Sequence, residues 1–340
     1  MKAWNITGVR EIMLEDRGAA PVPDDSVKIK MLKGALDTPD SLVFKGQAGA
    51  IPVVPGRQGM GIVSETGKNA VRFKRGDRVY AGPLSACGDC AACKAGRLRE
   101  CAALGQYGID RDGLLCDFAV LPQRDLYLLP NKVTDSESVF IERAAAGISV
   151  LDRLNTEKGE YVVIMGANAT GILLAQLALY YQAVPILVDV RRDRLDIAEK
   201  LGVYYTVDAV SSDPLKKVFS ITCGQMAESM VYALPCSLPL SRAFECVMPG
   251  GRAVVTGFAG SGEALSVNLA PLIDRQIAVS FVAAGVENIP TAINTFASGG
   301  IESDPLVTET IRFSEVDKFL ADNADDPFKN IYTLVDIDRL

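Results

Sequence analysis

Hydrophobic and polar positions follow two different patterns along the chain, and the change comes near Phe140. Before that point the apolar runs are short, and residues 27–32 and 77–81 alternate with a period of two, which is typical of strands with one buried face. Glycines recur between these runs, as at Gly56 and Gly59, and mark turns. This part of the chain is therefore predicted to be a mostly β domain.

From Phe140 to about Gly285, apolar runs of strand length alternate with segments of helical periodicity. The expected strands are residues 161–165, 186–188, 230–234 and 253–256, and the expected helices are residues 171–181, 192–201 and 239–247. Repeated strand–helix–strand units predict a parallel sheet with helices on both faces. The tail from residue 289 mixes helix and strand, and we expect its last apolar run, residues 331–335, to return to the first domain.

Composition limits the classes of protein to consider. The chain has 340 residues, 49% of them apolar, so two domains with large cores are expected. A net charge of −7 without a long basic run argues against a nucleic-acid partner, which needs clustered Lys and Arg. No apolar run approaches the ~18 residues that suggest a membrane helix, and the chain starts directly in a strand pattern without a signal peptide. We therefore expect a cytoplasmic protein whose eight cysteines are reduced or bind a metal.

Four cysteines have the spacing of a metal site. Cys87, Cys90, Cys93 and Cys101 form the pattern C-x2-C-x2-C-x7-C, and four thiolates this close can surround one zinc ion tetrahedrally. Four protein ligands leave no open position, so the predicted zinc site is structural. The remaining cysteines are expected to be core thiols: Cys116, Cys223, Cys236 and Cys246.

A candidate dinucleotide loop, Gly166-Ala167-Asn168-Ala169-Thr170-Gly171, lies between an expected strand and an expected helix. Gly166 suits the tight turn, and Gly171 suits close packing of the helix on the strand. Asn168 replaces the usual middle glycine; asparagine tolerates left-handed backbone angles, but it carries a side chain where pyrophosphate approaches. We take Gly166, Asn168, Thr170 and Gly171 as cofactor-binding candidates.

Asp189 ends the second expected strand of the sheet, 18 residues after Gly171. A carboxylate there accepts hydrogen bonds from the adenosine ribose hydroxyls and repels a 2′-phosphate, which favours NAD. Arg191 and Arg192 follow and could hold a phosphate instead, and Arg194 joins Arg191 as a cofactor-binding candidate, so NADP stays possible. The alternative is that Asp189 is only a solvated turn residue.

With these features the chain resembles the zinc-type alcohol dehydrogenase branch of the medium-chain dehydrogenase/reductase superfamily. The likeness also rests on residues 55–63, 76–79 and 249–254 and covers nearly the whole length. It implies an α/β protein with a chaperonin-10-like β-barrel catalytic domain and a doubly wound Rossmann domain that binds NAD. The expected ranges are residues 1–148 with a zinc lobe at about 85–105, then 149–287, then a return in 288–340. A cleft between the domains, a small-molecule substrate and a homodimer or homotetramer are further implications.

The residues that hold catalytic zinc in that family are replaced here. Leu36 stands at the cysteine of the first motif, Arg57 and Gln58 stand at the histidine and glutamate of the second, and Glu142 survives in the third. The chain has no histidine at all, and neither leucine nor arginine ligates zinc, so no catalytic zinc is expected. An oxygen-only site made by Asp37, Asp40 and Glu142 is a weaker alternative.

Without zinc or histidine, the least demanding chemistry is hydride transfer to a conjugated C=C or C=N bond, because the substrate spreads the charge. An enone- or imine-type reductase is therefore our first expectation. Arg57 is expected to fill the metal position and pair with Glu142, and Thr38 is the best proton-relay candidate, with Asp37 or Asp40 behind it. Tyr107 is a weaker candidate.

Other interpretations stay open. The Arg57–Glu142 pair is explained equally by a structural role in a site that has lost its function. An alcohol or polyol dehydrogenase with an unusual set of groups around the substrate is the second function. A non-catalytic protein that binds the cofactor as a redox sensor or subunit is the third, motivated by Asn168 and by the lost metal ligands.

Overall fold

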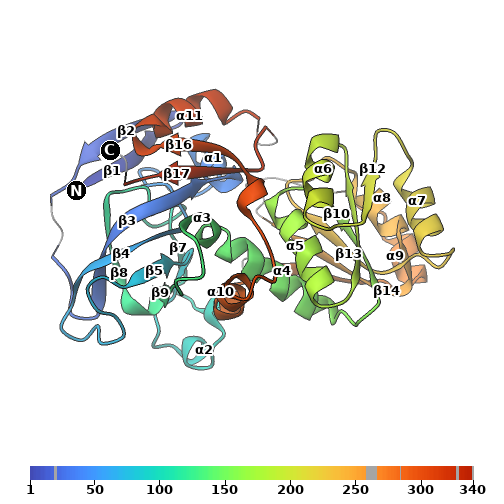
Figure 1. The fold of residues 1–340 in the computed structure, drawn as a ribbon, viewed down its shortest axis with the longest axis horizontal. Helices are drawn as coiled ribbons and strands as arrows, with labels where there is room; N and C mark the ends of the chain where they lie inside the picture. Colours follow the sequence, from blue (N-terminus) through green and yellow to red (C-terminus); the bar gives the residue numbers. More distant parts are fainter. Residues whose placement is uncertain (19–20, 258–265, 284, 327–328, 339–340) are drawn as a thin grey trace. The chain divides into compact units, whose positions relative to one another are not determined.

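The computed structural model describes residues 1–18, 21–257, 266–283, 285–326 and 329–338. The chain divides into two units, one made of Met1–Glu142 with Val307–Leu340 and the other of Arg143–Leu306 (Figure 1). The second unit therefore includes residues 143–148 and 288–306, which lie at the edges of the ranges expected from sequence. Of the described helices, none combines the length and apolar character that crossing a membrane requires.

A seven-stranded sheet forms the centre of the described part of the first unit. Its order is β16-β17-β3-β4-β5-β9, and β8 also pairs with β3. The strands are β3 (Ser26–Leu36), β4 (Gly59–Thr66), β5 (Arg78–Ala81), β8 (Phe118–Pro122), β9 (Leu126–Leu128), β16 (Val307–Arg312) and β17 (Tyr332–Asp336). β17 runs antiparallel to β3, with Thr333 opposite Leu36, so the last apolar run does return to the first sheet.

Shorter elements surround this sheet. They are β1 (Lys2–Gly8), β2 (Glu11–Asp16), β6 (Leu84–Ser85), β7 (Gly105–Gln106), α1 (Thr38–Phe44), α2 (Ala91–Lys94), α3 (Asp135–Ser138) and α11 (Val316–Asn323). The 3-10 helices of this unit are η1 (Leu98–Glu100), η2 (Gln123–Asp125) and η5 (Phe313–Glu315). α1 begins directly after β3 ends, and this junction places the candidate residues around Thr38.

The second unit is built on a parallel sheet of the order β12-β11-β10-β13-β14-β15. Its strands are β10 (Tyr161–Met165), β11 (Val184–Asp189), β12 (Tyr205–Asp208), β13 (Ala227–Ala233), β14 (Val247–Thr256) and β15 (Ala278–Val282). Its helices are α4 (Ile141–Leu154), α5 (Ala169–Tyr180), α6 (Arg192–Lys200), α7 (Pro214–Ile221), α8 (Leu240–Glu245), α9 (Ala270–Asp274), α10 (Ile289–Ala297), η3 (Val286–Asn288) and η4 (Asp304–Leu306). The first two residues of α4 belong to the first unit.

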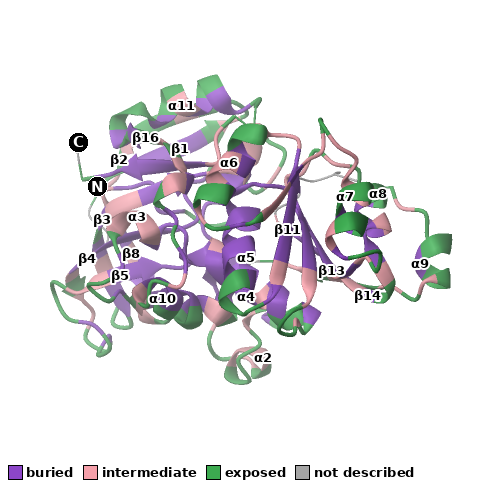
Figure 2. Cartoon of the chain, turned by 45° about the vertical axis from the view of Figure 1, so that its right-hand side comes forward, coloured by how far each residue is buried: buried purple, intermediate pink, exposed green. Residues whose placement is uncertain are grey.

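Helices cover both faces of this sheet. Val163 and Met165 of β10 share a buried cluster with Val218 of α7 and Phe244 of α8. Ile164 points the other way, because successive side chains of a strand alternate, and its methyl group lies beside α5 at Gly171. Burial on both sides explains the continuous apolar runs, and Figure 2 shows β11 and β13 as largely buried. The α/β fold with a doubly wound parallel sheet is thus confirmed.

Candidate functional site

The segment that carries Thr38 and Asp37 is fixed at the junction of β3 and α1. Asp37 is the N-cap residue of α1, and its backbone N–H donates to Oδ2 of Asp40 at 3.1 Å. The side chain of Asp37 accepts from the N–H of Asp40 in return, which completes a capping box. Pro39 lies in the first turn, where its missing N–H has no cost. Thr38, the first residue of the helix, is half-buried.

Asp40 connects this helix to the turn that carries Arg57. Its Oδ1 accepts a hydrogen bond from the backbone N–H of Gly56 at 2.8 Å, and the side chain is 1% exposed. Gly56 has φ of +91°, and a Cβ there would lie 2.9 Å from the backbone nitrogen of Leu115, so the turn requires glycine. Burial, and next the negative charge of Asp37, raise the pKa of Asp40 to about 7.

Arg57 and Glu142 form an ion pair in the interior of the first unit. Nη2 of Arg57 lies 3.5 Å from Oε1 of Glu142, and the two side chains are 5% and 3% exposed. Glu142 belongs to the first turn of α4. The structure therefore brings these two candidates together, and each charge has an opposite charge beside it, as buried charges require.

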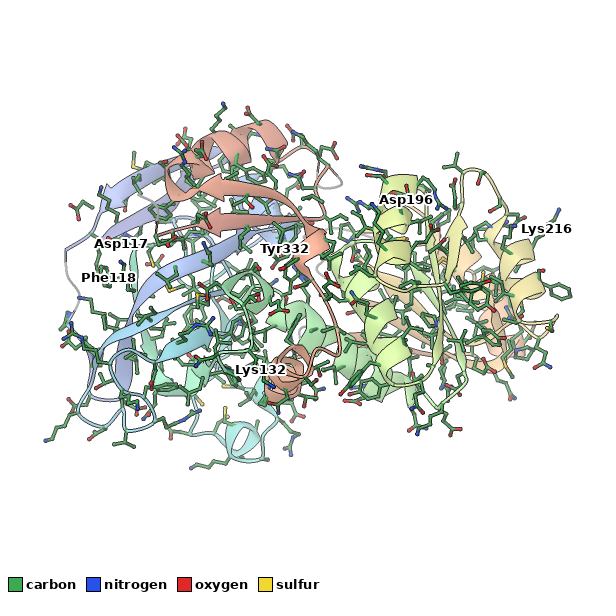
Figure 3. The ribbon with its side chains drawn as sticks, in the orientation of Figure 1. Asp117, Phe118, Lys132, Asp196, Lys216 and Tyr332 are labelled. Carbon is green, nitrogen blue, oxygen red and sulfur yellow. The ribbon has the colours of Figure 1, made fainter. Side chains whose placement is uncertain are left out.

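Gln58 is the centre of a buried hydrogen-bond chain. Its Oε1 accepts from the hydroxyl of Tyr80 at 2.8 Å, and its Nε2 donates to the hydroxyl of Tyr332 at 2.8 Å. That hydroxyl in turn donates to the carbonyl of Val139 at 2.9 Å, and Figure 3 labels Tyr332 on β17. A carboxylate could not donate to Tyr332. The amide of Gln58 therefore suits this place, and no local pattern in the sequence indicates its two partners.

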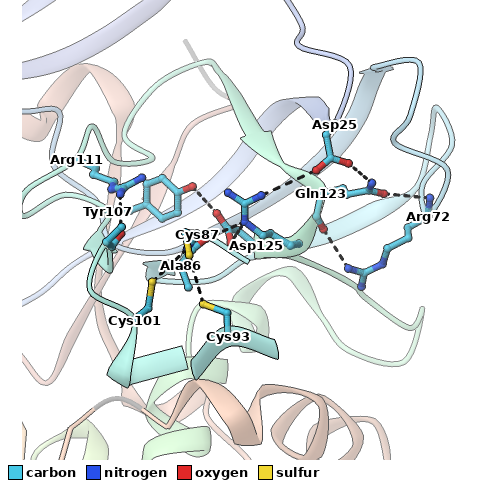
Figure 4. Close-up of polar contacts among 12 residues, drawn as sticks. Asp25, Arg72, Ala86, Cys87, Cys93, Cys101, Tyr107, Arg111, Gln123 and Asp125 are labelled. Carbon is cyan, nitrogen blue, oxygen red and sulfur yellow. Dashed lines mark hydrogen bonds and ion pairs between the residues drawn. The ribbon is translucent and has the colours of Figure 1, made fainter. Parts of the chain in front are cut away.

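Thr38 and Asp37 also line a small pocket within the first unit. The pocket has a volume of about 50 Å³, and Leu36 and Ser41 also line it. Further lining residues come from α11 and from residues 330–333. Tyr107, the weaker candidate, lies elsewhere and donates its hydroxyl to Asp125 at 2.8 Å, as Figure 4 shows. Burial raises the pKa of Tyr107, which suits a hydroxyl that stays protonated.

The four cysteines of the predicted metal site come together on the lobe around α2, and Figure 4 labels three of them, Cys87, Cys93 and Cys101. All four sulfur atoms lie within 4.8 Å of one another, and Sγ of Cys87 is 3.8 Å from Sγ of Cys93. A tetrahedral site with zinc–sulfur bonds of about 2.3 Å places its sulfur atoms about 3.8 Å apart. Backbone N–H groups of Cys87, Cys90 and Cys93 each point at a cysteine sulfur of the cluster at 3.4 Å. The donor set and its spacing therefore fit one zinc ion.

The expectation for the other cysteines is only partly right. Cys116 and Cys246 are buried, and Cys236 is half-buried. Cys223 is exposed, so the expectation of a core thiol is wrong there. It has φ of +51° and lies in the turn that follows α7.

The dinucleotide loop has the backbone geometry that its glycines allow. Gly166 has φ of +106°, and a Cβ there would lie 2.8 Å from the carbonyl oxygen of Ala233. A Cβ on Gly171 would lie 1.9 Å from the carbonyl oxygen of Gly166, so α5 packs against the turn at a distance that only glycine permits. Thr170, in the first turn of α5, is buried. The loop therefore fits a bound dinucleotide at the N-terminus of this helix.

Asn168 plays a different part from the one expected. Its φ of −82° is not left-handed, so tolerance of left-handed angles does not explain the asparagine. The residue is the N-cap of α5, and its Oδ1 accepts from the backbone N–H of Gly171 at 3.0 Å. Its Nδ2 donates to the carbonyls of Ala233 at 2.9 Å and Pro235 at 3.2 Å. The side chain is thus folded into the protein.

Asp189 lies at the end of β11 and is 9% exposed, which corrects the alternative of a solvated turn residue. Its Oδ2 accepts from the backbone N–H of Ala167 at 2.5 Å, and its Oδ1 accepts from the N–H of Arg191 at 2.8 Å. The carboxylate therefore joins the dinucleotide loop to the turn after β11.

The arginines after Asp189 are paired with acids of their own helix. Arg191 contacts Asp193 through Nε at 2.9 Å and Nη2 at 2.8 Å. Arg192 reaches both Asp196 and Glu199 at 2.7 Å, and Figure 3 marks Asp196 on α6. Arg194 is 3% exposed and lies on the buried side of α6.

Comparison with known proteins agrees with this fold and loop. A family model described as alcohol dehydrogenase GroES-like domain matches residues 23–131, and one described as zinc-binding dehydrogenase matches residues 169–298. An uncharacterized zinc-type alcohol dehydrogenase-like protein of Haemophilus influenzae is 30% identical over 279 residues, which are 81% of this chain and 80% of that protein. The chain therefore belongs to the medium-chain dehydrogenase/reductase superfamily, in the zinc-type alcohol dehydrogenase branch, and is an NAD(P)-dependent oxidoreductase.

Two further proteins illustrate the range of this likeness. Sorbitol dehydrogenase of Bacillus subtilis is 27% identical over 319 residues, which are 91% of this chain and 89% of that enzyme. A zinc-binding dehydrogenase of Sinorhizobium meliloti 1021, solved with bound NADP, superposes with a TM-score of 0.89 at 24% identity, covering 99% of each chain. At that identity the second likeness concerns the fold.

Proposed function

We propose that this chain is a nicotinamide-dependent alcohol or polyol dehydrogenase in which Arg57 takes over the charge-stabilising role of a catalytic metal. The observation that carries the proposal is the buried Arg57–Glu142 pair, which stands at two positions of the family's zinc motifs. Relatives named sorbitol dehydrogenase and D-xylulose reductase support this function. Nothing in the comparisons supports reduction of a conjugated C=C or C=N bond, our first expectation from sequence.

The chemistry of alcohol oxidation explains why a fixed cation is needed. A bound nicotinamide accepts hydride from the carbon that carries the hydroxyl, and the protein has to stabilise the negative charge on the oxygen. The guanidinium of Arg57 supplies a planar cation and is held in the interior by Glu142. In this proposal it faces the substrate oxygen, while Glu142 keeps the guanidinium stable when no substrate is bound.

Proton removal is assigned to Thr38. Its hydroxyl lies at the first position of α1, beside Asp37, in the segment that Asp40 fixes to the turn before Arg57. The hydroxyl accepts the proton of the substrate alcohol while it donates its own proton onward, toward Asp37. Because Asp40 connects the two segments, Thr38 and Arg57 keep a constant relationship.

For the cofactor we infer a preference for NAD over NADP. The carboxylate of Asp189 is fixed at the strand end where the adenosine ribose is recognised, and its charge opposes a 2′-phosphate. Arg191 and Arg192 are paired with acids of α6, which lowers the positive charge available to a phosphate. We expect kcat/KM measured with NAD to exceed kcat/KM measured with NADP by more than about tenfold. A ratio below one would contradict the preference.

The decisive experiment is turnover by protein that has been washed with a chelator strong enough to remove loosely bound zinc. Sorbitol, xylitol, butanediol and simple secondary alcohols are offered with NAD, and an enone and a cyclic imine are offered with NADH. Oxidation of at least one alcohol by protein that holds a single zinc per chain supports the proposal. Enone or imine reduction without alcohol oxidation contradicts it, and cofactor binding without any turnover favours a non-catalytic subunit.

A further inference from the structure

Asn168 lies in the loop between β10 and α5, at one end of the parallel sheet. β10 leads into the dinucleotide loop and β13 leads into the segment after Ala233, and these parallel strands are neighbours. From β10 the sheet continues through β11 to β12, and from β13 it continues in the opposite direction to β15. The strand order therefore reverses between them, and open α/β sheets bind their ligands at such a point.

The side chain of Asn168 bridges the two loops at this reversal. It reaches the carbonyls of Ala233 and Pro235 from the loop after β10, and it also caps α5 through the N–H of Gly171. Both N–H groups and the oxygen of the amide are thus used, and the residue is 8% exposed. A glycine, the usual residue of the fingerprint, would make none of these three contacts.

We propose that Asn168 is a positioning residue for the dinucleotide, and that its amide acts as a latch between residues 166–171 and residues 233–235. The latch holds the backbone N–H groups at the start of α5 in place before the cofactor arrives. Binding then costs less loop ordering, which is the usual benefit of preorganisation. The inference rests on a dinucleotide as the cofactor and not on the alcohol substrate proposed above.

The latch, rather than the helix cap, is the part expected to matter for binding. Replacing an asparagine cap by glycine costs a helix only a few tenths of a kcal/mol, because glycine is accepted at that position. The two bonds from Nδ2 connect segments that are 65 and 67 residues apart. They restrain the loop that contains Gly166 and Gly171 on the side of β13, whereas Asp189 restrains it on the side of β11.

Two substitutions separate the cap from the latch. Asn168→Ser keeps a hydroxyl oxygen that can cap the N–H of Gly171, but it is too short to reach the carbonyls of Ala233 and Pro235. Asn168→Gly removes both functions. The dissociation constant for NADH is measured by fluorescence titration without substrate. We expect it to rise about tenfold in both variants, because each loses the two hydrogen bonds of the latch, which are of ordinary strength.

A matched control tests whether lost stability alone explains weaker binding. Val218→Ala removes two methyl groups from the core of the same unit, on α7, without touching either loop. It is expected to lower Tm at least as much as Asn168→Ser while leaving the dissociation constant for NADH unchanged. Equal weakening in Val218→Ala would overturn the proposal.

Two other outcomes would also reject the latch. Wild-type affinity in Asn168→Ser would assign the effect to the cap, and equal or tighter binding in Asn168→Gly would mean that the asparagine only obstructs the cofactor. Since no alcohol is present in the titration, these outcomes are independent of the proposed dehydrogenase activity. Protein that oxidises no alcohol but shows the expected affinities still supports the latch.

Discussion

The carboxylate of Asp40 accepts the backbone N–H of Gly56 at 2.8 Å, and this bond joins the two segments that carry Thr38 and Arg57. The residues are 16 positions apart: Asp40 belongs to α1, and Gly56 lies in the turn before β4. A buried acid whose bonds come from N–H groups is held in one orientation. The geometry between the proposed relay and the proposed cation therefore depends on a single side chain that touches neither substrate nor cofactor in our scheme.

Asp40 should make stability depend on pH. Its pKa is about 7 in the folded chain against an ordinary value of 3.8, so the folded state binds this proton more tightly than the unfolded state. Between these two pH values the free energy of unfolding falls as the pH rises. Unfolding releases the proton that Asp40 holds in the folded chain, and a higher pH favours that release. Asn in place of Asp40 still accepts from Gly56 and does not titrate. Relative to Asp40→Asn, the wild-type Tm should be higher at about pH 5 than at about pH 8.

The charged groups facing Asp40 are Asp37, which raises its pKa, and Arg57, which lowers it. Asp274→Asn, at an exposed position of α9, is the control for removing an acid elsewhere, and Tm is measured for both variants at both pH values. A Tm difference between wild type and Asp40→Asn that does not vary with pH would show that Asp40 does not titrate in this window.

Two variants at Arg57 separate a loss of activity from a loss of stability. Arg57→Ala alone leaves Glu142 buried without its partner and should destabilise the first unit by about 3–5 kcal/mol. The double variant Arg57→Met/Glu142→Leu replaces the pair by apolar side chains of similar size, which is often neutral for stability. We expect it to keep its Tm and to lose at least about 100-fold in kcat, since one preorganised donor is worth that much.

Lysine at position 57 is the matched comparison for charge. Arg57→Lys keeps a cation but lacks the planar fork, so an intermediate kcat is expected. Wild-type turnover in the stable double variant would instead assign the pair a purely structural role.

Position 58 should tolerate glutamate, the residue of the family motif, poorly. A glutamate at this position could still accept from Tyr80, but its carboxylate cannot donate to the hydroxyl of Tyr332. It would also place a second negative charge near Glu142. We expect Gln58→Glu to lower the free energy of unfolding by about 1–3 kcal/mol, measured by urea titration. Unchanged stability would mean that the hydrogen-bond chain contributes little.

The cysteine cluster predicts a defined metal content. Chelator-washed protein should hold one zinc ion per chain, and Cys87→Ser/Cys90→Ser should lose both the metal and much of its thermal stability, because a structural zinc contributes directly to folding. Cys223→Ser is the control, since that thiol is exposed and outside the cluster. Two zinc ions per chain in wild-type protein would revive a catalytic metal site and would reverse our assignment of Arg57.

The sequence predicts those features of the structure that depend on residues close together in the chain. The run at residues 161–165 is β10, and the four cysteines meet because their spacing already limits how far apart they can lie. Asn168 shows the limit of such reasoning: its position in the motif was evident, but its dihedral angles and its partners at residues 233 and 235 depend on the neighbouring strand.

Long-range polar partners escaped prediction for the same reason. Gln58 and Tyr332 are 274 residues apart, and no periodicity or spacing connects them. The bond from Gly56 to Asp40 likewise follows from how a turn packs on a helix. Buried polar groups choose their partners from whatever the fold brings close, so a single sequence reveals that they need a partner but not which one.

The pairing of β17 with β3 has a consequence for the order of events during synthesis. When the first 142 residues have left the ribosome, the sheet of their unit still lacks β16 and β17, and the whole of the second unit has to be translated before those strands exist. Gln58 therefore waits for Tyr332, and residues 33–36 of β3 lack a partner on that edge until β17 has been translated, whereas β8 already pairs with residues 26–30. The nascent chain therefore exposes a short unpaired strand edge while the second unit is being translated, and such edges favour pairing with other chains.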